Sequence, residues 1–210
     1  MTHFTSKGDM MTFTRLFSSL LASALLASSL HAWTSSLFAQ GTPQCDDKDV
    51  QDLVKDTYLD TYLKQSGITD LKLHSHKEVS EYGERAEQIF RTKLKLTMDS
   101  FGTVLTDEEK KLVGCNARIS GDMRDNDIRE AFELMFKAYA AKTTLGKNEV
   151  LTDRKFDDFI KRQFGSHSKY EKELDKLVEK ADEELHGLIL YDARRADDGK
   201  LIVEIDIVRE

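Results

Sequence analysis

The sequence has one proline, two cysteines and no excess of basic residues. Pro43 alone does not make a proline-rich linker. The 31 Lys and Arg residues face 38 Asp and Glu residues, which gives a formal net charge of −7. Because phosphate neutralisation supplies most of the affinity for nucleic acid, this balance argues against nucleic acid as a partner, and equally against anionic lipid. If charge steers a partner to this protein, we expect that partner to be basic, and we expect it to be another protein.

Motifs for metal binding and catalysis are also missing. The chain has no Cys-x-x-Cys pair, no Cys and His residues at zinc spacing and no Gly-x-Ser-x-Gly frame for a nucleophilic serine. We therefore predict no catalytic residue, no metal site and no cofactor. The sequence favours a role that is not enzymatic, and it leaves an enzymatic one open.

The N-terminal region has the pattern of an export signal. An uncharged run extends from Leu16 to Leu30 directly after Arg15, and small residues follow it. This pattern predicts a cleavable signal peptide over residues 1–39. Cleavage after Ala39 is favoured and cleavage after Ala32 is the alternative. A membrane anchor is a weaker interpretation, because the run is rich in Ser and Ala and is marginal for a span. We expect a periplasmic or secreted protein without stable membrane insertion after cleavage.

The two cysteines, Cys45 and Cys115, both fall in the predicted mature chain. An exported protein meets an oxidising environment, so the pair predicts a structural disulfide. A bridge that closes this long loop would restrict the unfolded chain by roughly 4 kcal/mol in the loop-entropy account. The alternative is a pair of unrelated thiols or metal ligands, but further soft ligands at a suitable spacing are missing.

Hydrophobic periodicity divides the mature chain into helices and strands. Helical spacing predicts helices over 46–65 and 78–90, with 68–77 as a loop or short strand between them. Alternation predicts a hairpin of strands over 94–104 and 112–123, joined by a polar connection at 106–111. Helical patterns return over 125–185, where Gly146, Thr152, Gly165 and a capping box at Ser168 mark the ends of three helices. Strands over 187–194 and 200–208 flank the turn sequence at 197–199.

This order predicts an α+β fold, with an N-terminal helix packed on a four-stranded antiparallel sheet. A three-helix insertion at about 125–185 lies between the second and third strands, within a single domain over 40–210. The arrangement resembles the cystatin-like helix over a curved meander. The resemblance is one of architecture and rests on no sequence motif, so it implies no function.

Three groups of polar residues were weighed as chemical sites. His74 and His76 are weak candidates for a zinc or copper site, because a third ligand is lacking and an exposed loop explains them better. His167 lies beside two serines but lacks the turn that a nucleophilic serine needs. Glu183, Glu184 and His186 are carboxylates and an imidazole at a helix–strand junction, and a chain this acidic produces such groupings by chance.

The predicted helical insertion is rich in aromatic residues and methionine. A helix that is apolar around its circumference must bury most of its sides, so one interpretation is packing within the insertion. The other is that a soft apolar face receives a partner or an apolar ligand. The residues concerned are Phe132, Met135, Phe136, Tyr139, Phe156, Phe159 and Phe164.

These observations favour a periplasmic or secreted protein-binding module. It would present the helical insertion or the exposed sheet face to another protein, as an inhibitor, an immunity protein or an accessory factor of envelope assembly. The alternative is a small periplasmic ligand carrier or hydrolase with a pocket between the sheet and its helices. A structural envelope component is a third interpretation, and it would predict self-association.

Overall fold

The computed structural model describes residues 41–146 and 149–208. The predicted signal peptide and both cleavage positions lie outside these residues. Contacts divide the chain into two compact units, a sheet unit with residues 41–61, 94–123 and 181–208 and a helical unit with residues 62–93 and 124–180. No helix in the described ranges is both long and apolar enough to cross a membrane.

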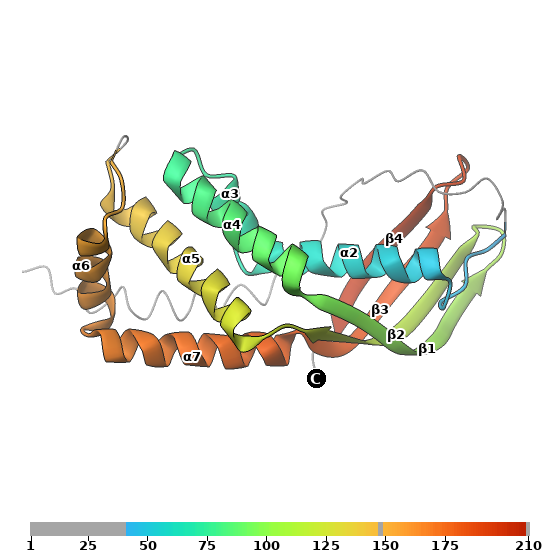
Figure 1. The fold of residues 1–210 in the computed structure, drawn as a ribbon. Helices are drawn as coiled ribbons and strands as arrows, with labels where there is room; N and C mark the ends of the chain where they lie inside the picture. The colour runs from blue at the N-terminus through green and yellow to red at the C-terminus, as the bar shows by residue number, and fades with distance from the viewer. Residues whose placement is uncertain (1–40, 147–148, 209–210) are drawn as a thin grey trace, which may run out of the picture. The chain divides into compact units, whose positions relative to one another are not determined.

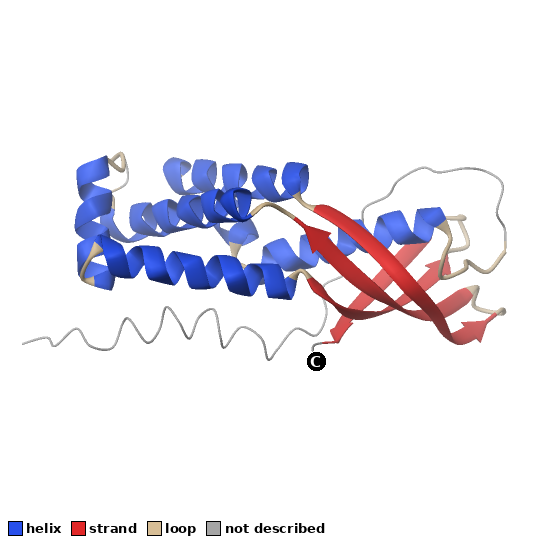
Figure 2. Cartoon of the chain, turned by 60° about the horizontal axis from the view of Figure 1, so that its bottom comes forward, coloured by secondary structure: helices blue, strands red, loops and turns tan. Residues whose placement is uncertain are grey.

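The sheet unit contains four antiparallel strands in the order of the chain. They are β1 (Lys95–Asp107), β2 (Leu112–Asp122), β3 (His186–Arg195) and β4 (Leu201–Val208). The strands twist across one another, as the backbone of L-residues requires (Figure 2). The two hairpins join through β2 and β3, although about sixty residues of chain separate them, which confirms the predicted four-stranded antiparallel sheet.

Helix α2 (Lys48–Gln65) packs its first turns on one face of this sheet (Figure 1). Its apolar stripe meets the inward-facing residues of the strands, as the spacing predicted. The half-buried residues Leu96, Met98, Leu201 and Val203 flank this core at the outer strands. The buried residues of this core are Cys45, Val50, Val54, Tyr58, Val113, Cys115, Ala117, Ile119, Ile189, Tyr191 and Ala193.

The predicted disulfide is confirmed. Cys45 and Cys115 are bonded, with their Cα atoms 5.7 Å apart, so the segment that precedes α2 is joined to the second strand. The Tyr191 hydroxyl donates to the carbonyl oxygen of Cys45 at 2.7 Å in a buried position. Burial, and secondarily the charge of Asp46, raises the pKa of Tyr191 to about 12. Tyr58 similarly donates to the Glu184 carbonyl oxygen at 3.0 Å. The segment before α2 is therefore held by a covalent bond and a buried hydrogen bond, and the middle of α2 by the hydrogen bond of Tyr58.

The helical unit contains α3 (Ile68–Lys72), α4 (Lys77–Lys93), α5 (Asp125–Thr144), α6 (Asp153–Phe164) and most of α7 (His167–Glu184). Helices α4 and α5 pack together around Val79, Ala138 and Ala141. Helix α3 approaches α4 closely at Gly83, where a Cβ atom would lie 2.4 Å from the Lys72 nitrogen. Only glycine permits this approach, so the close packing of α3 explains why a glycine lies in the middle of α4.

The structure corrects the sequence prediction at three places. The segment 68–77, expected as a loop or short strand, begins with α3, which buries Ile68. Strand β1 continues to Asp107, past the expected end at 104. Helix α7 begins at His167, so Ser166 rather than Ser168 caps it and accepts from the Lys169 nitrogen at 3.3 Å. The first error arose because five residues are too few to show a helical period.

Other predicted boundaries are confirmed. Thr152 is the N-cap of α6 and accepts from the Lys155 nitrogen at 3.4 Å. Gly165 ends α6 in the left-handed region with φ 79°, which L side chains disfavour. The turn between β3 and β4 places Gly199 at φ 83°. These positions were readable because their backbone geometry requires particular residue types.

Candidate functional site

The sheet has one face that α2 covers and one that it does not. On β3, Ile189, Tyr191 and Ala193 point toward α2 and are buried, so Leu188 and Leu190 point to the opposite side. These two leucines are 36% and 37% exposed. We call this second side of the sheet the open face, and its described residues include Leu105, Arg118, Leu188, Leu190, Asp192, Arg194, Glu204 and Asp206.

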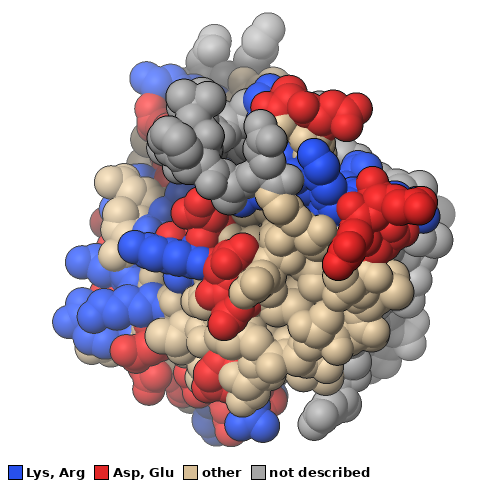
Figure 3. All heavy atoms as spheres, turned by 90° about the vertical axis from the view of Figure 1, so that its right-hand side faces the viewer, with Lys and Arg blue, Asp and Glu red and all other residues tan. Residues whose placement is uncertain are grey.

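At two positions of the sheet, a glycine leaves space that side chains of the neighbouring strands occupy. A Cβ atom at Gly114 would lie 3.3 Å from the Leu105 Cβ and 3.1 Å from the Asp192 Oδ1, so these side chains close over the glycine from both neighbouring strands. A Cβ atom at Gly102 would lie 2.4 Å from the Asn116 Oδ1. Leu105 is 55% exposed and adds to the apolar surface of Leu188 and Leu190. Uncharged side chains also form a continuous area at the end of the sheet unit, beside groups of Asp and Glu (Figure 3).

The charges on the open face are exposed and weakly paired. Arg194 Nη2 and Glu204 Oε1 are 4.0 Å apart, at the limit of an ion pair, and both side chains are more than half exposed. Such a pair contributes little to folding. Asp192 lies directly opposite Glu204 in the β3–β4 register. Carboxylates on opposing strands repel each other, so this pair does not contribute to the stability of the sheet.

The residues predicted to bind a partner pack within the helical unit, and Tyr139, Phe156 and Phe164 among them are only half-buried. Phe132, Met135, Phe136 and Phe159 are buried. The rings of Phe136 and Phe159 meet those of neighbouring helices edge to face. The Phe136 centroid lies 5.3 Å from that of Tyr170, and the Phe159 centroid lies 6.0 Å from that of Tyr139. Phe156 stacks on Phe159 and Phe164 packs on Phe136. The structure thus shows these side chains packing on one another, and their binding of a partner stays a prediction.

Tyr170 is the polar member of this aromatic cluster. Its hydroxyl is buried and has no hydrogen-bond partner among the described residues. Burial, reinforced by the negative charges of Glu133 and Glu171, raises its pKa well above the ordinary value for tyrosine. An unpaired buried hydroxyl costs stability, so the ring and not the hydroxyl explains why a tyrosine fits there.

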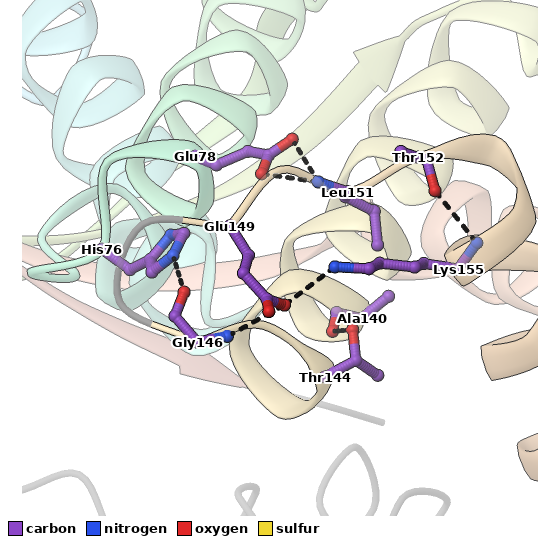
Figure 4. A network of polar contacts seen from close by, with 9 residues as sticks. All are labelled: His76, Glu78, Ala140, Thr144, Gly146, Glu149, Leu151, Thr152 and Lys155. Atoms are coloured by element: carbon purple, nitrogen blue, oxygen red, sulfur yellow. Dashed lines mark hydrogen bonds and ion pairs between the residues drawn. The ribbon is translucent and has the colours of Figure 1, made fainter.

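A network of polar contacts ties the segment between α5 and α6 to the start of α4 (Figure 4). The Leu151 nitrogen donates to the Glu78 carboxylate at 2.8 Å, and His76 Nε2 lies 3.3 Å from the Gly146 carbonyl oxygen. Glu149 accepts from Lys155 Nζ at 2.8 Å, and this contact together with the Gly146 amide keeps the pKa of Glu149 below its usual value. The network holds the connection in place by ordinary backbone and ion-pair contacts.

An open depression of about 640 Å³ lies next to this network on the helical unit. The Thr143 and Thr144 hydroxyls at its border donate to carbonyl oxygens of their own helix. Two of its cations, Lys161 and Arg162, lie in the last turn of α6, where they complement the negative end of the helix. Sequence reasoning missed this place, although polar residues recur at helical spacing opposite the apolar face of α6. The lining residues are Thr143, Thr144, Lys155, Asp158, Lys161 and Arg162.

The histidines do not assemble into a site. His74 Nδ1 accepts from the His76 backbone nitrogen at 3.1 Å, a local turn contact. His167 Nε2 lies 3.4 Å from Asp157 Oδ1 at an exposed position. His186 is exposed at the start of β3. Within the part of the chain that the structure describes, no group of three or more His, Cys, Asp or Glu side chains is placed to hold a metal ion.

Comparison with known proteins finds no matching family model, no matching curated protein and no matching solved structure. Only the surfaces and side chains described above therefore bear on its function.

Proposed function

We propose that this chain is an exported protein-binding module that presents the open face of its sheet to another protein. The exposure of Leu188 and Leu190 opposite the α2 face carries this proposal. A strand that is needed only for a one-sided core alternates apolar and polar residues, whereas here both sides of β3 are apolar over 188–191. Apolar side chains gathered on a surface mark interaction sites, and those of the helical insertion are buried or half-buried against one another.

The N-terminal sequence and the disulfide also support this proposal, because both suit an exported protein. The uncharged run behind Arg15 has the composition of a cleavable signal, and the disulfide between Cys45 and Cys115 suits an oxidising compartment. We propose a mature protein that begins after Ala39, with Ala32 as the second cleavage position, and that acts in the periplasm or after secretion.

Among protein-binding roles, inhibition, immunity and assisted assembly in the envelope fit best. Each needs a stable docking surface and no catalytic group. A basic partner suits the net charge of −7. The alternative, a ligand carrier or hydrolase, requires an apolar pocket with convergent polar groups. The depression beside α6 is widely open to solvent, which does not favour that alternative.

The test is retention of a partner from envelope extract by the mature protein as the cell processes it. Intact mass first establishes the cleavage position and the state of the two cysteines. We expect the wild-type protein to retain one partner in stoichiometric amount and the variant Leu190→Lys to lose it, because a lysine on the open face interrupts its apolar surface and repels a basic partner.

The matched control is Leu73→Lys, which makes the same change at a leucine of the helical unit that is 75% exposed. This variant should retain the partner. Melting curves of both variants separate loss of binding from loss of folding. Absence of any stoichiometric partner, or equal retention by folded Leu190→Lys, contradicts the proposal.

A further inference from the structure

The two edges of the sheet differ in regularity. Among the described residues, β1 and β4 each pair with a single neighbouring strand, so each presents one row of backbone groups at an edge (Figure 1). Open edges invite pairing with another strand, and natural sheets protect the edges that are to stay free. A comparison of the two edges therefore indicates which of them is suited to receive a strand.

The β1 edge is interrupted. Its register with β2 shifts between Asp99 and Gly102 and again between Thr103 and Leu105. Ser100, within the first irregularity, has φ 57°, a conformation that L-residues other than asparagine and aspartate seldom adopt. Bulges of this kind bend the strand and break the even spacing of backbone donors and acceptors. An incoming strand finds no continuous ladder there.

The β4 edge is continuous. Each residue from Leu201 to Val208 is paired in turn with β3, from Arg195 back to Leu188, without a shift. Leu201, Val203 and Ile205 point toward the α2 face and are only partly buried there, because no further strand covers them on the outer side in the described structure. A strand added at this edge would bury their exposed sides and pair the free backbone groups.

The open-face side chains of β4 define the charge of such a strand. Glu204 and Asp206 are exposed, and Asp192 of β3 stands directly opposite Glu204. Two carboxylates opposite each other on neighbouring strands are unfavourable, whereas a cation on the next strand is favourable. Lys or Arg at alternate positions of an added strand would therefore face these carboxylates, while apolar residues between them continue the α2-side core.

We propose that the β4 edge is the docking edge of this protein and that it takes an extended segment of its partner in which apolar and basic residues alternate. This inference rests on the proposed function and names the mode of binding and the chemistry of the segment. Backbone pairing supplies the affinity, and the acidic row sets the preference for a basic strand.

The probe is a labelled synthetic peptide that alternates Val and Lys over the length of an ordinary strand, about eight residues. A peptide of the same composition with all Val residues followed by all Lys residues is the control for charge alone. Fluorescence anisotropy measures binding to the mature protein, and amide hydrogen exchange locates it. We expect the alternating peptide to bind more tightly than the block peptide and to protect amides of 201–208 but not those of 95–107.

The decisive variant is Glu204→Lys with Asp206→Lys, which we expect to weaken the alternating peptide about tenfold, since tenfold corresponds to about 1.4 kcal/mol spread over two cross-strand pairs. The matched control, Glu108→Lys with Glu109→Lys, makes the same charge change in the exposed β1–β2 turn and should alter binding less than twofold by the same reasoning. Equal weakening by both variants, or protection of β1 instead of β4, overturns the inference.

The same β4 variant in the envelope retention assay separates this inference from the proposed function. If the wild-type protein retains a partner, Leu190→Lys loses it and the β4 variant keeps it, the open face is the docking surface and the β4 edge is not. If the β4 variant also loses the partner, both the proposed function and the docking at the β4 edge are supported. If no partner is retained by any form of the protein, the proposed function itself fails.

Discussion

The two units of this protein are held together in different ways. The sheet unit closes its core with a disulfide and gives its buried tyrosines, Tyr58 and Tyr191, backbone carbonyls to bond. The helical unit relies on an aromatic cluster in which the Tyr170 hydroxyl is unpaired among the described residues. Polar groups that are buried and satisfied specify one arrangement, whereas packed rings mainly exclude water. We therefore expect changes of the same chemical kind to have opposite effects in the two units.

Removal of the disulfide should have the largest effect. Replacing Cys45 and Cys115 by alanine is expected to cost roughly 4 kcal/mol, because it restores the freedom of a long loop in the unfolded chain. Hydrogen exchange should show lost protection in β2 and β3 and little change in α5. Dithiothreitol should reproduce this in the wild-type protein and leave the variant unchanged. Equal loss of protection in α5 would break the comparison, because the units would then unfold together.

Removing one tyrosine hydroxyl from each unit should change the free energy of unfolding in opposite directions. Tyr191→Phe leaves the Cys45 carbonyl oxygen without its buried donor and should destabilise the protein by about 1–2 kcal/mol. Tyr170→Phe removes a hydroxyl that has no described partner and should stabilise the protein by about 1 kcal/mol. Urea titrations of the two variants measure both values. A destabilised Tyr170→Phe variant would show that this hydroxyl is bonded in solution.

The smallest effect should come from an ion pair of the helical unit. Glu87 accepts from Lys72 Nζ at 2.9 Å and from Arg91 Nε at 2.7 Å. Burial acts to raise the pKa of Glu87, but these two cations outweigh it and the pKa lies below its usual value. Both cations are well exposed, so solvent screening should limit the cost of Glu87→Gln to less than about 1 kcal/mol.

The pH dependence of this variant follows from the same lowered pKa. A carboxyl whose pKa is lower in the folded state stabilises the protein above its unfolded pKa, about 4.3 for glutamate, and stops doing so as the pH falls through its folded pKa. Wild type and Glu87→Gln should therefore differ in urea midpoint at pH 7 and converge at acid pH. A difference that grows on acidification would contradict this assignment.

Parts of the fold could be predicted from residues whose backbone conformation, or whose hydrophobic period, permits few alternatives. Thr152, Gly165 and Gly199 mark a cap, a helix end and a turn, and all three stand where the pattern placed them. Helix α3 and the cap at Ser166 were missed, because five residues show no period and neighbouring serines are equivalent as caps. The surfaces were harder to predict, since an aromatic residue on a helix has the same spacing whether it faces a partner or a core.

The sequence by itself determined an antiparallel α+β fold and the pairing of Cys45 with Cys115, because periodicity records which side of each element is apolar and two cysteines allow one bond. Only the tertiary structure decided which apolar side chains are buried by packing and which remain exposed. It packed the phenylalanines of the insertion against one another, buried or half-buried, and left Leu188 and Leu190 exposed on the open face. The reason is that exposure depends on what neighbouring elements cover, and contacts between residues far apart in the chain decide that.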